Sequence, residues 1–334
     1  MAESGQPYRR WQPDGAYDAV VIGSGIGGLG VAALLAGRAG KRALVLERHA
    51  TKAGGFTHIF KRKGFEWDVG LHYVGEVHRP DSTIRRLFDE ITGGRLDWQP
   101  MGDVYDTVVV GEERFEYVAG RDSWRQRMHE CFPAEIKAVD RYLDLVTETV
   151  RGARSYFGAK ALPGPAAAVA GPFMRRGFLK HASRTVAEVL DELTDDALLK
   201  TVLTAQYGDY GLTPKHASFG IHAMVVNHYL RGAGYPVGGS GRIAAEIIPE
   251  IEKTGGEVVV GAEVAEILME RGRAVGVTMA DGREIRAPLV ISDAGVPNTV
   301  RTLLPPDAPG RRALASVLTR VPPSTSHICL YVGL

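Results

Sequence analysis

A glycine-rich turn near the N-terminus constrains the fold of this chain more than any other feature. The apolar run YDAVVIG at 17–23 predicts a buried parallel strand, and the sequence GSGIGG at 23–28 has G-x-G-x-x-G spacing. In that spacing the first glycine makes a tight turn, the second lets backbone approach a pyrophosphate, and the third lets the helix pack on the strand. Small and aliphatic residues at 28–39 predict the helix, whose N-terminus favours bound phosphate.

A second apolar run, ALVLE at 43–47, completes a β-α-β unit and ends in an acid. A carboxylate at this strand end, about 20 residues after the glycine motif, accepts hydrogen bonds from a ribose diol. The unit predicts a site for FAD or NAD, and an ordinary strand and turn is the alternative. Glu47-Arg48 followed by Gly54-Gly55 favours FAD, because a second loop would bring backbone amides back to the pyrophosphate of an extended FAD.

Patterns after this first unit predict an insertion of different character. Apolar runs predict a hairpin at 106–110 and 114–118, and helical patterns follow at 123–130, 134–154, 185–192 and 195–206. After the insertion, the patterns again predict a helix followed by strands. The helix is expected at 239–253 and the strands at 257–260, 264–270, 274–279 and 289–292. The predicted fold class is α/β: a Rossmann-like, doubly wound domain interrupted by a largely helical insertion with a small β-sheet.

Charge and cysteine content limit the kinds of partner and the cellular compartment that we expect for the protein. The 40 Lys and Arg residues against 39 Asp and Glu give a formal charge of +1, so no global field attracts nucleic acid. Cys131 and Cys329 are too few for a disulfide framework and lack the spacing of a metal site. Residues 1–16 hold no apolar signal core, and no run of about 18 apolar residues occurs. We expect a cytoplasmic protein without nucleic-acid partner or metal.

The segment 151–187 is basic and partly apolar. It holds seven Lys and Arg residues and no Asp or Glu, and its middle part, 161–174, is rich in Ala, Pro and Gly. Such a segment can lie on an anionic bilayer surface, which would make the protein a peripheral membrane protein. A solvated loop between helices is the alternative.

Two groups of polar and aromatic residues are further site candidates. His72 lies in the glycine-rich stretch 64–75, where it is either a hydrogen-bonded core residue or a group near a flavin ring or substrate. A second group lies at 207–229, where His222 and Tyr229 are spaced to share one helix face. We expect this second group to line a substrate tunnel or to pack in the core, and no carboxylate joins it at metal-ligand spacing.

Longer stretches resemble a known family. The runs YDAVVIGSGIGGL, VLERHATKAGGFTHIF and GFEWDVGLHYVG are similar to the phytoene desaturase and carotenoid isomerase flavoproteins, above all to their retinol saturase branch. The runs YGDYGLTPKHASFGIHAMVVNHYLRGAGYPVGGSGRI and VISDAGVPNTVRTLLP continue the resemblance, which covers nearly all of 17–334.

The resemblance implies FAD in a fold of the GR2 type, with NAD(P)H as a candidate reductant. It assigns the cofactor contacts to Gly23, Ser24, Gly25, Gly28, Glu47, Arg48, Gly54, Gly55, Val264, Asp293 and Ala294. Gly238-Gly239 matches the crossing between the substrate and FAD domains, and a plain hairpin or a helix N-cap at Ser240 is the alternative.

The implied activity is oxidoreduction at carbon–carbon double bonds of a hydrophobic polyene, by saturation, desaturation or isomerisation. His72 or Tyr73 would donate the partner proton. The alternatives are an FAD enzyme of amine-oxidase type and a flavin-binding fragment without activity of its own.

The resemblance also implies domain boundaries and a missing C-terminal part. The strand-like run SHICLYVGL at 326–334 has no turn after it, whereas family members continue further. We therefore expect a fragment, or a half that needs a separately encoded C-terminal partner. The expected parts are a flexible N-terminus (1–16), an FAD-binding domain (17–75 and 238–310), a helical substrate insertion (76–237) and the start of a truncated substrate-domain sheet (311–334).

Overall fold

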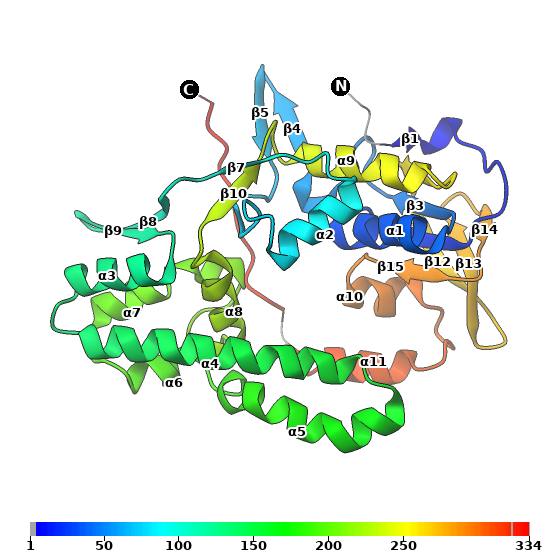
Figure 1. Ribbon diagram of the computed structural model, residues 1–334. Helices are drawn as coiled ribbons and strands as arrows, with labels where there is room; N and C mark the ends of the chain where they lie inside the picture. The colour runs from blue at the N-terminus through cyan, green and yellow to red at the C-terminus, as the bar shows by residue number, and fades with distance from the viewer. Residues whose placement is uncertain (1–4, 322, 334) are drawn as a thin grey trace.

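The computed structural model describes residues 5–321 and 323–333, and a five-stranded parallel sheet forms one side of the molecule (Figure 1). Neighbouring strands pair in parallel register, as expected for strands joined by long crossovers. The strand order is β1 (Gln6–Pro7), β11 (Glu257–Val260), β3 (Ala43–Glu47), β2 (Ala19–Ile22) and β15 (Val290–Ser292).

Different layers cover the two faces of this sheet, and strand alternation decides which residues meet each layer. Val21 and Val45 contribute to a core with helices α1 (Ile26–Ala39), α2 (Thr83–Thr92) and α9 (Gly241–Glu252). Their neighbours Val20 and Leu44 point the other way. They contribute to a second core with an antiparallel sheet of β12 (Val264–Glu270), β13 (Arg273–Met279) and β14 (Glu284–Arg286).

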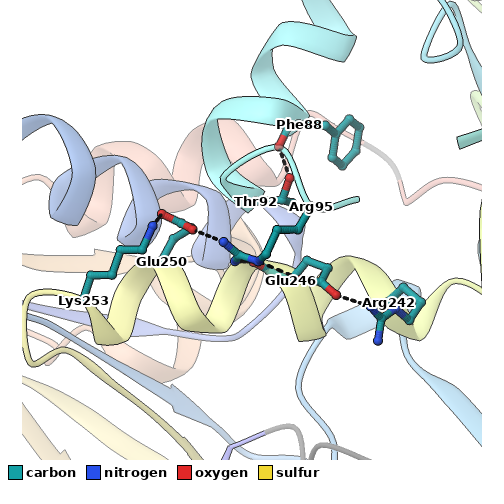
Figure 2. A network of polar contacts seen from close by, with 7 residues as sticks. All are labelled: Phe88, Thr92, Arg95, Arg242, Glu246, Glu250 and Lys253. Atoms are coloured by element: carbon teal, nitrogen blue, oxygen red, sulfur yellow. Dashed lines mark hydrogen bonds and ion pairs between the residues drawn. The ribbon is translucent and has the colours of Figure 1, made fainter. Parts of the chain in front are cut away.

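A polar network joins the turn after α2 to α9 (Figure 2). The Arg95 guanidinium donates from Nε to Glu246 at 3.0 Å and from one terminal nitrogen to Glu250 at 2.6 Å. Its other terminal nitrogen donates to the Glu246 carbonyl at 2.7 Å. Arg242 pairs with the same Glu246 side chain, and Lys253 pairs with Glu250 at 2.6 Å. Because Glu246 is 8% exposed, these basic partners compensate a nearly buried charge.

The helical insertion has a core of its own (Figure 1). Its large buried side chains include Trp124, Tyr142 and Phe219. Its hairpin is β8 (Val104–Val110) and β9 (Glu113–Val118), and its helices are α3 (Arg121–Cys131), α4 (Ile136–Lys160), α5 (Gly164–Ala182), α6 (Val186–Asp191), α7 (Ala197–Leu203) and α8 (Phe219–Tyr229). A three-stranded sheet of β6 (Val74–Gly75), β10 (Ala233–Pro236) and β7 (Trp98–Pro100) lies at the start and end of the insertion.

The predicted fold class is confirmed: a Rossmann-like parallel sheet, a helical insertion and small antiparallel sheets. The expected hairpin and the strands at 257–260, 264–270 and 274–279 form within a few residues of their predicted positions. At the crossing, Ser240 occupies the N-cap position of α9, but its hydroxyl donates to Asp68 at 2.5 Å and makes no cap bond to the helix.

The expected flexible N-terminus is wrong for residues 5–16, whereas residues 1–4 lie outside the described part of the chain. The short strand β1 pairs with β11 at the edge of the parallel sheet. Trp11 is only 2% exposed, and its indole nitrogen donates to Glu257 at 3.1 Å. The reason is that β11 would otherwise present an unpaired edge, which the N-terminal segment covers.

The expected strand near the C-terminus is also wrong for the described residues. Arg311–Leu318 forms helix α11, and residues 323–333 have no strand assignment; Leu334 lies outside the described part. The segment is held by isolated contacts, including the Tyr331 hydroxyl donating to the Val69 carbonyl at 3.0 Å. An apolar run becomes a strand only when a neighbouring strand completes its hydrogen bonds, and no described strand pairs with this one.

Candidate dinucleotide site

A cavity of about 650 Å³ opens at the carboxyl ends of β2 and β3, beside the N-terminus of α1. This is the edge at which open α/β sheets bind ligands. Its wall includes most of the residues that the sequence predicts for the cofactor: Gly23, Ser24, Gly25, Glu47, Arg48, Gly54, Gly55, Val264, Asp293 and Ala294. Among the predicted cofactor residues, only Gly28 is missing from the cavity wall, and it lies one turn into the helix start.

The glycine turn has no room for larger side chains. A Cβ atom on Gly28 would lie 2.2 Å from the Gly23 carbonyl oxygen, and one on Gly25 would lie 2.5 Å from an Asp293 carboxylate oxygen. Gly23 itself adopts a φ of 96°, which favours glycine. Within the described residues, no group accepts a hydrogen bond from the backbone N–H of Gly25, Ile26 or Gly27. These three N–H groups can therefore bind phosphate oxygens at the helix N-terminus.

The Glu47 carboxylate is fixed at the end of β3. One of its oxygens accepts from the Ser24 N–H at 2.9 Å and the Ser24 hydroxyl at 2.6 Å, and the other accepts from the His49 N–H at 2.7 Å. A carboxylate has about four acceptor positions, so one position is free for a further donor. Since Glu47 lines the cavity, a ribose hydroxyl is a suitable donor.

Asp293 follows β15 and faces the same turn. Its carboxylate accepts from the Gly28 N–H at 3.0 Å, which satisfies one of the unpaired donors at the start of α1. Its own N–H donates to the Ile22 carbonyl at 2.7 Å, and this bond joins the segment to the end of β2. The carboxylate thus occupies one side of the helix start and leaves the donors at 25–27 open.

The Gly54-Gly55 loop lies directly against the glycine turn. Gly54 donates to the Ser24 hydroxyl at 3.1 Å, and a Cβ on Gly55 would lie 2.9 Å from the Gly25 Cα. Both loop glycines have positive φ, 118° and 55°. These two glycines and the adjacent Phe56, which is 79% exposed, complete the wall at this end of the cavity.

The candidate proton donors His72 and Tyr73 do not line this cavity. They are joined to its wall through Gly70, two residues before His72, whose N–H donates to the Phe56 carbonyl at 3.1 Å. Both belong to a group that we call the aromatic–acid cluster, made of His72, Tyr73, Asp106, Gln206, Asp209 and Tyr229.

Two carboxylates organise the aromatic–acid cluster. The Tyr73 hydroxyl donates to Asp106 at 2.5 Å, and Nε2 of His72 lies 3.5 Å from an Asp209 oxygen. The Tyr229 ring packs against both residues, with ring centroids 5.1 Å from Tyr73 and 6.3 Å from His72. Burial raises the pKa of the Asp209 carboxyl above its usual range, although neighbouring His72 acts in the opposite direction. The cluster thus joins a carboxyl whose pKa is raised by burial with a half-exposed imidazole.

The sequence did not indicate Asp106, Gln206 or Asp209 as site residues. They lie on β8 and the short 3₁₀ helix Ala205–Asp209, far along the chain from His72, so no local motif joins them. The dense aromatic region at 207–229 was the only signal nearby.

His222, from that same region, is a core residue. It is 1% exposed, and its two ring nitrogens meet the hydroxyls of Tyr142 at 2.8 Å and Tyr210 at 3.0 Å. Burial lowers its pKa to about 4. With both nitrogens satisfied and no solvent access, His222 serves packing, whereas Tyr229 on the same helix reaches the aromatic–acid cluster.

Comparison with known proteins agrees with this geometry. Residues 21–91 match the NAD(P)-binding Rossmann-like domain family. An all-trans-retinol 13,14-reductase of Danio rerio is 43% identical over 95% of this chain and 54% of its own length. A lycopene-forming phytoene desaturase of a Paracoccus strain is 27% identical over 90% of this chain and 59% of its own length. The chain is thus similar in sequence to all-trans-retinol 13,14-reductases and, at lower identity, to a phytoene desaturase.

This similarity confirms the resemblance expected from the sequence, for the part of the relatives' length that the chain spans. That part is about half of the retinol reductase. Among solved structures, cyclohexylamine oxidase from Brevibacterium oxydans matches with a TM-score of 0.56, at 19% identity, over 90% of this chain and 63% of its own. At that identity the likeness shows a shared fold and gives no support for amine substrates.

Proposed function

We propose that this chain binds FAD and acts in an oxidoreductase for the carbon–carbon double bonds of a hydrophobic polyene. The observation that carries the proposal is the contact between the two glycine loops, where Gly55 lies against Gly25 at the mouth of one cavity. A second loop at the pyrophosphate position suits the long FAD molecule. The retinol and phytoene enzymes among its relatives support a polyene as substrate.

The residues present fit FAD. The N–H groups of Gly25, Ile26 and Gly27 would hold the pyrophosphate, and Glu47 would accept from the adenosine ribose. The remaining wall residues that we propose as contacts are Gly23, Ser24, Gly28 behind the turn, Arg48, Gly54, Gly55, Val264, Asp293 and Ala294. When bound, FAD supplies or takes a hydride with its two electrons, and NAD(P)H is the reductant we propose for it.

The aromatic–acid cluster would supply the proton. Saturation of a double bond adds one hydride and one proton, so a protein acid must give up a proton and regain it from water. Asp209 holds its proton to higher pH than an exposed carboxyl, and His72 beside it has a half-exposed ring that can pass the proton on. We propose His72 as the donor, with Asp209 as its proton source and Tyr73 held in place by Asp106.

The absorption spectrum of the purified chain tests the cofactor. We expect the bands of oxidised flavin, and their loss in Gly25→Arg, because a side chain there meets Asp293. Gly37→Ala is the matched control, since a Cβ at that helical glycine meets nothing within 4 Å. A folded chain that stays colourless, even when co-expressed with the C-terminal half of the Danio rerio relative, contradicts the FAD proposal and supports a fragment without flavin chemistry.

Anaerobic turnover of all-trans-retinol by the flavin-loaded protein tests the substrate and the proton donor together. We expect Asp209→Asn to slow turnover and to change its pH profile, whereas Asp195→Asn, an exposed carboxylate, leaves both unchanged. Hydrogen peroxide release with amines, and no polyene turnover, would instead support the amine-oxidase alternative.

A further inference from the structure

The helix pair α4–α5 lies at the edge of the molecule (Figure 1), and it carries exposed apolar side chains. On α5, Val169 is 74% exposed and Phe173 is 79% exposed, and on α4 Phe157 is 48% exposed. Only Gly171, Phe178 and His181 are buried in the whole of α5. The solvated loop that was one alternative for 151–187 is therefore wrong, because most of the segment is helical.

The packing of α5 leaves one of its sides open. The two helices approach closely at Gly152, where an added Cβ would lie 2.7 Å from the Phe178 backbone nitrogen. The side of α5 that carries Val169 and Phe173 faces away from this contact, as their exposure shows. We call this side, together with the exposed end of α4, the α5 face. It is formed by Phe157, Lys160, Val169, Phe173, Arg176 and Lys180.

The charges of the segment that carries the α5 face are of one sign, although Glu148 on neighbouring α4 lies near Lys180. Arg176 and Lys180 follow Phe173 at helical spacing, so they continue the same side of α5. Residues 151–187 hold seven Lys and Arg residues and no Asp or Glu. Arg184 pairs with Glu192 at 2.6 Å, whereas in the described part of the chain the other six make no ion pair. The cations thus remain available to an external anionic partner.

We infer that the α5 face docks on an anionic lipid bilayer. The helix would lie in the plane of the interface, with Phe173 and Val169 among the acyl chains and headgroups and with Arg176 and Lys180 on lipid phosphates. The mode of contact is peripheral, since no helix in the described ranges is long and apolar enough to cross a bilayer. An acidic protein surface would match only the charges. A bilayer offers apolar acyl chains for the exposed Phe and Val and anionic phosphates for the cations beside them.

Vesicle flotation of the whole 334-residue chain tests this inference and needs neither flavin nor turnover. We expect the chain to float with vesicles of phosphatidylcholine and phosphatidylserine, and to stay in solution with phosphatidylcholine alone. The double variant Arg176→Gln, Lys180→Gln should bind about 30-fold more weakly, from about 1 kcal/mol per basic residue near the surface. Phe173→Ser should also weaken binding, because it removes the most exposed apolar side chain of the helix.

Matched controls change the same charge and the same kind of side chain elsewhere. Arg9→Gln, Arg10→Gln removes two exposed cations from the N-terminal segment, and Val109→Ser removes a 55% exposed apolar residue from β8. Circular dichroism confirms that each variant is folded. The inference is overturned if the wild-type chain fails to float, if both vesicle types bind it equally, or if the controls weaken binding as much as the α5 variants. Binding to polyglutamate without flotation also overturns it and indicates an acidic protein partner.

Discussion

The parallel-sheet part and the helical insertion build their polar sites in opposite ways. At the sheet edge, the ligand groups are mostly backbone N–H donors, and short-range features such as the glycines at 23–28 position them. Beside the insertion, the aromatic–acid cluster is made of side chains from four separate segments, and His72 and Asp209 meet only in the folded chain. Backbone sites can therefore be recognised in a sequence, whereas side-chain clusters depend on tertiary packing.

The largest predicted losses of stability come from substitutions in the two hydrophobic cores, and each loss should be confined to the part of the molecule that holds the substitution. Phe219→Ala removes a fully buried ring from the insertion core and should cost about 3–5 kcal/mol of its unfolding free energy. Leu29→Ala, which truncates a fully buried side chain of α1, should cost about 2–5 kcal/mol in the sheet part. Hydrogen exchange measured by mass spectrometry should show increased exchange in the affected part only. Equal increases in both parts for both variants would contradict two separately packed cores.

Acid should destabilise the insertion first. Burial lowers the pKa of His222 to about 4, below the ordinary value near 6.5, so only the unfolded chain binds its proton between these values. Stability is therefore complete above about pH 6.5 and falls by roughly 3 kcal/mol as the pH drops toward 4. Urea unfolding across this range checks the slope, and His222→Gln should remove most of it. A slope unchanged by this variant would assign the acid sensitivity to other groups.

A smaller effect is expected where α2 meets α9. Arg95→Met leaves the nearly buried Glu246 with Arg242 alone and should cost about 2 kcal/mol. Arg38→Met is the control, because it breaks an exposed pair with Glu90 and should cost less than about 1 kcal/mol. Thermal unfolding of the two variants gives the comparison. A loss of equal size in both would show that the network in Figure 2 adds nothing beyond a surface pair.

The smallest change should affect binding alone. Glu47→Gln keeps the size of the side chain but removes the charge that accepts three donors, and should weaken binding of the proposed FAD about 5- to 10-fold. The unfolding free energy of the flavin-free chain should change little in comparison. Titration of the flavin-free chain with FAD measures the affinity, with the exposed Glu112→Gln as control. Unchanged affinity would remove Glu47 from the proposed contacts.

Expectations from sequence failed where pairing with a distant segment decides the structure. Nothing local in the polar segment 5–16 indicates that Trp11 is buried against Glu257. The apolar run near 326–333 has the composition of a strand, yet the described part of the chain offers no edge for it. In 161–174, Pro and Gly suggested a loop, but packing of α5 on α4 overrides those weak local preferences.

The amino-acid sequence alone determined the β-α-β unit, the glycine turn and the acid at the end of β3, since each depends on residues close together in the chain. Strands and helices follow from apolar residues repeating every 2 or 3.6 positions, and tight turns follow from the conformations open to glycine. Because these features depend only on neighbouring residues, the sequence is enough to predict them. Only the tertiary structure decided that Gly55 closes on Gly25, that Asp293 covers the helix start and that Asp209 lies beside His72. Those contacts arise from burial and chain crossing, which no short stretch of sequence encodes.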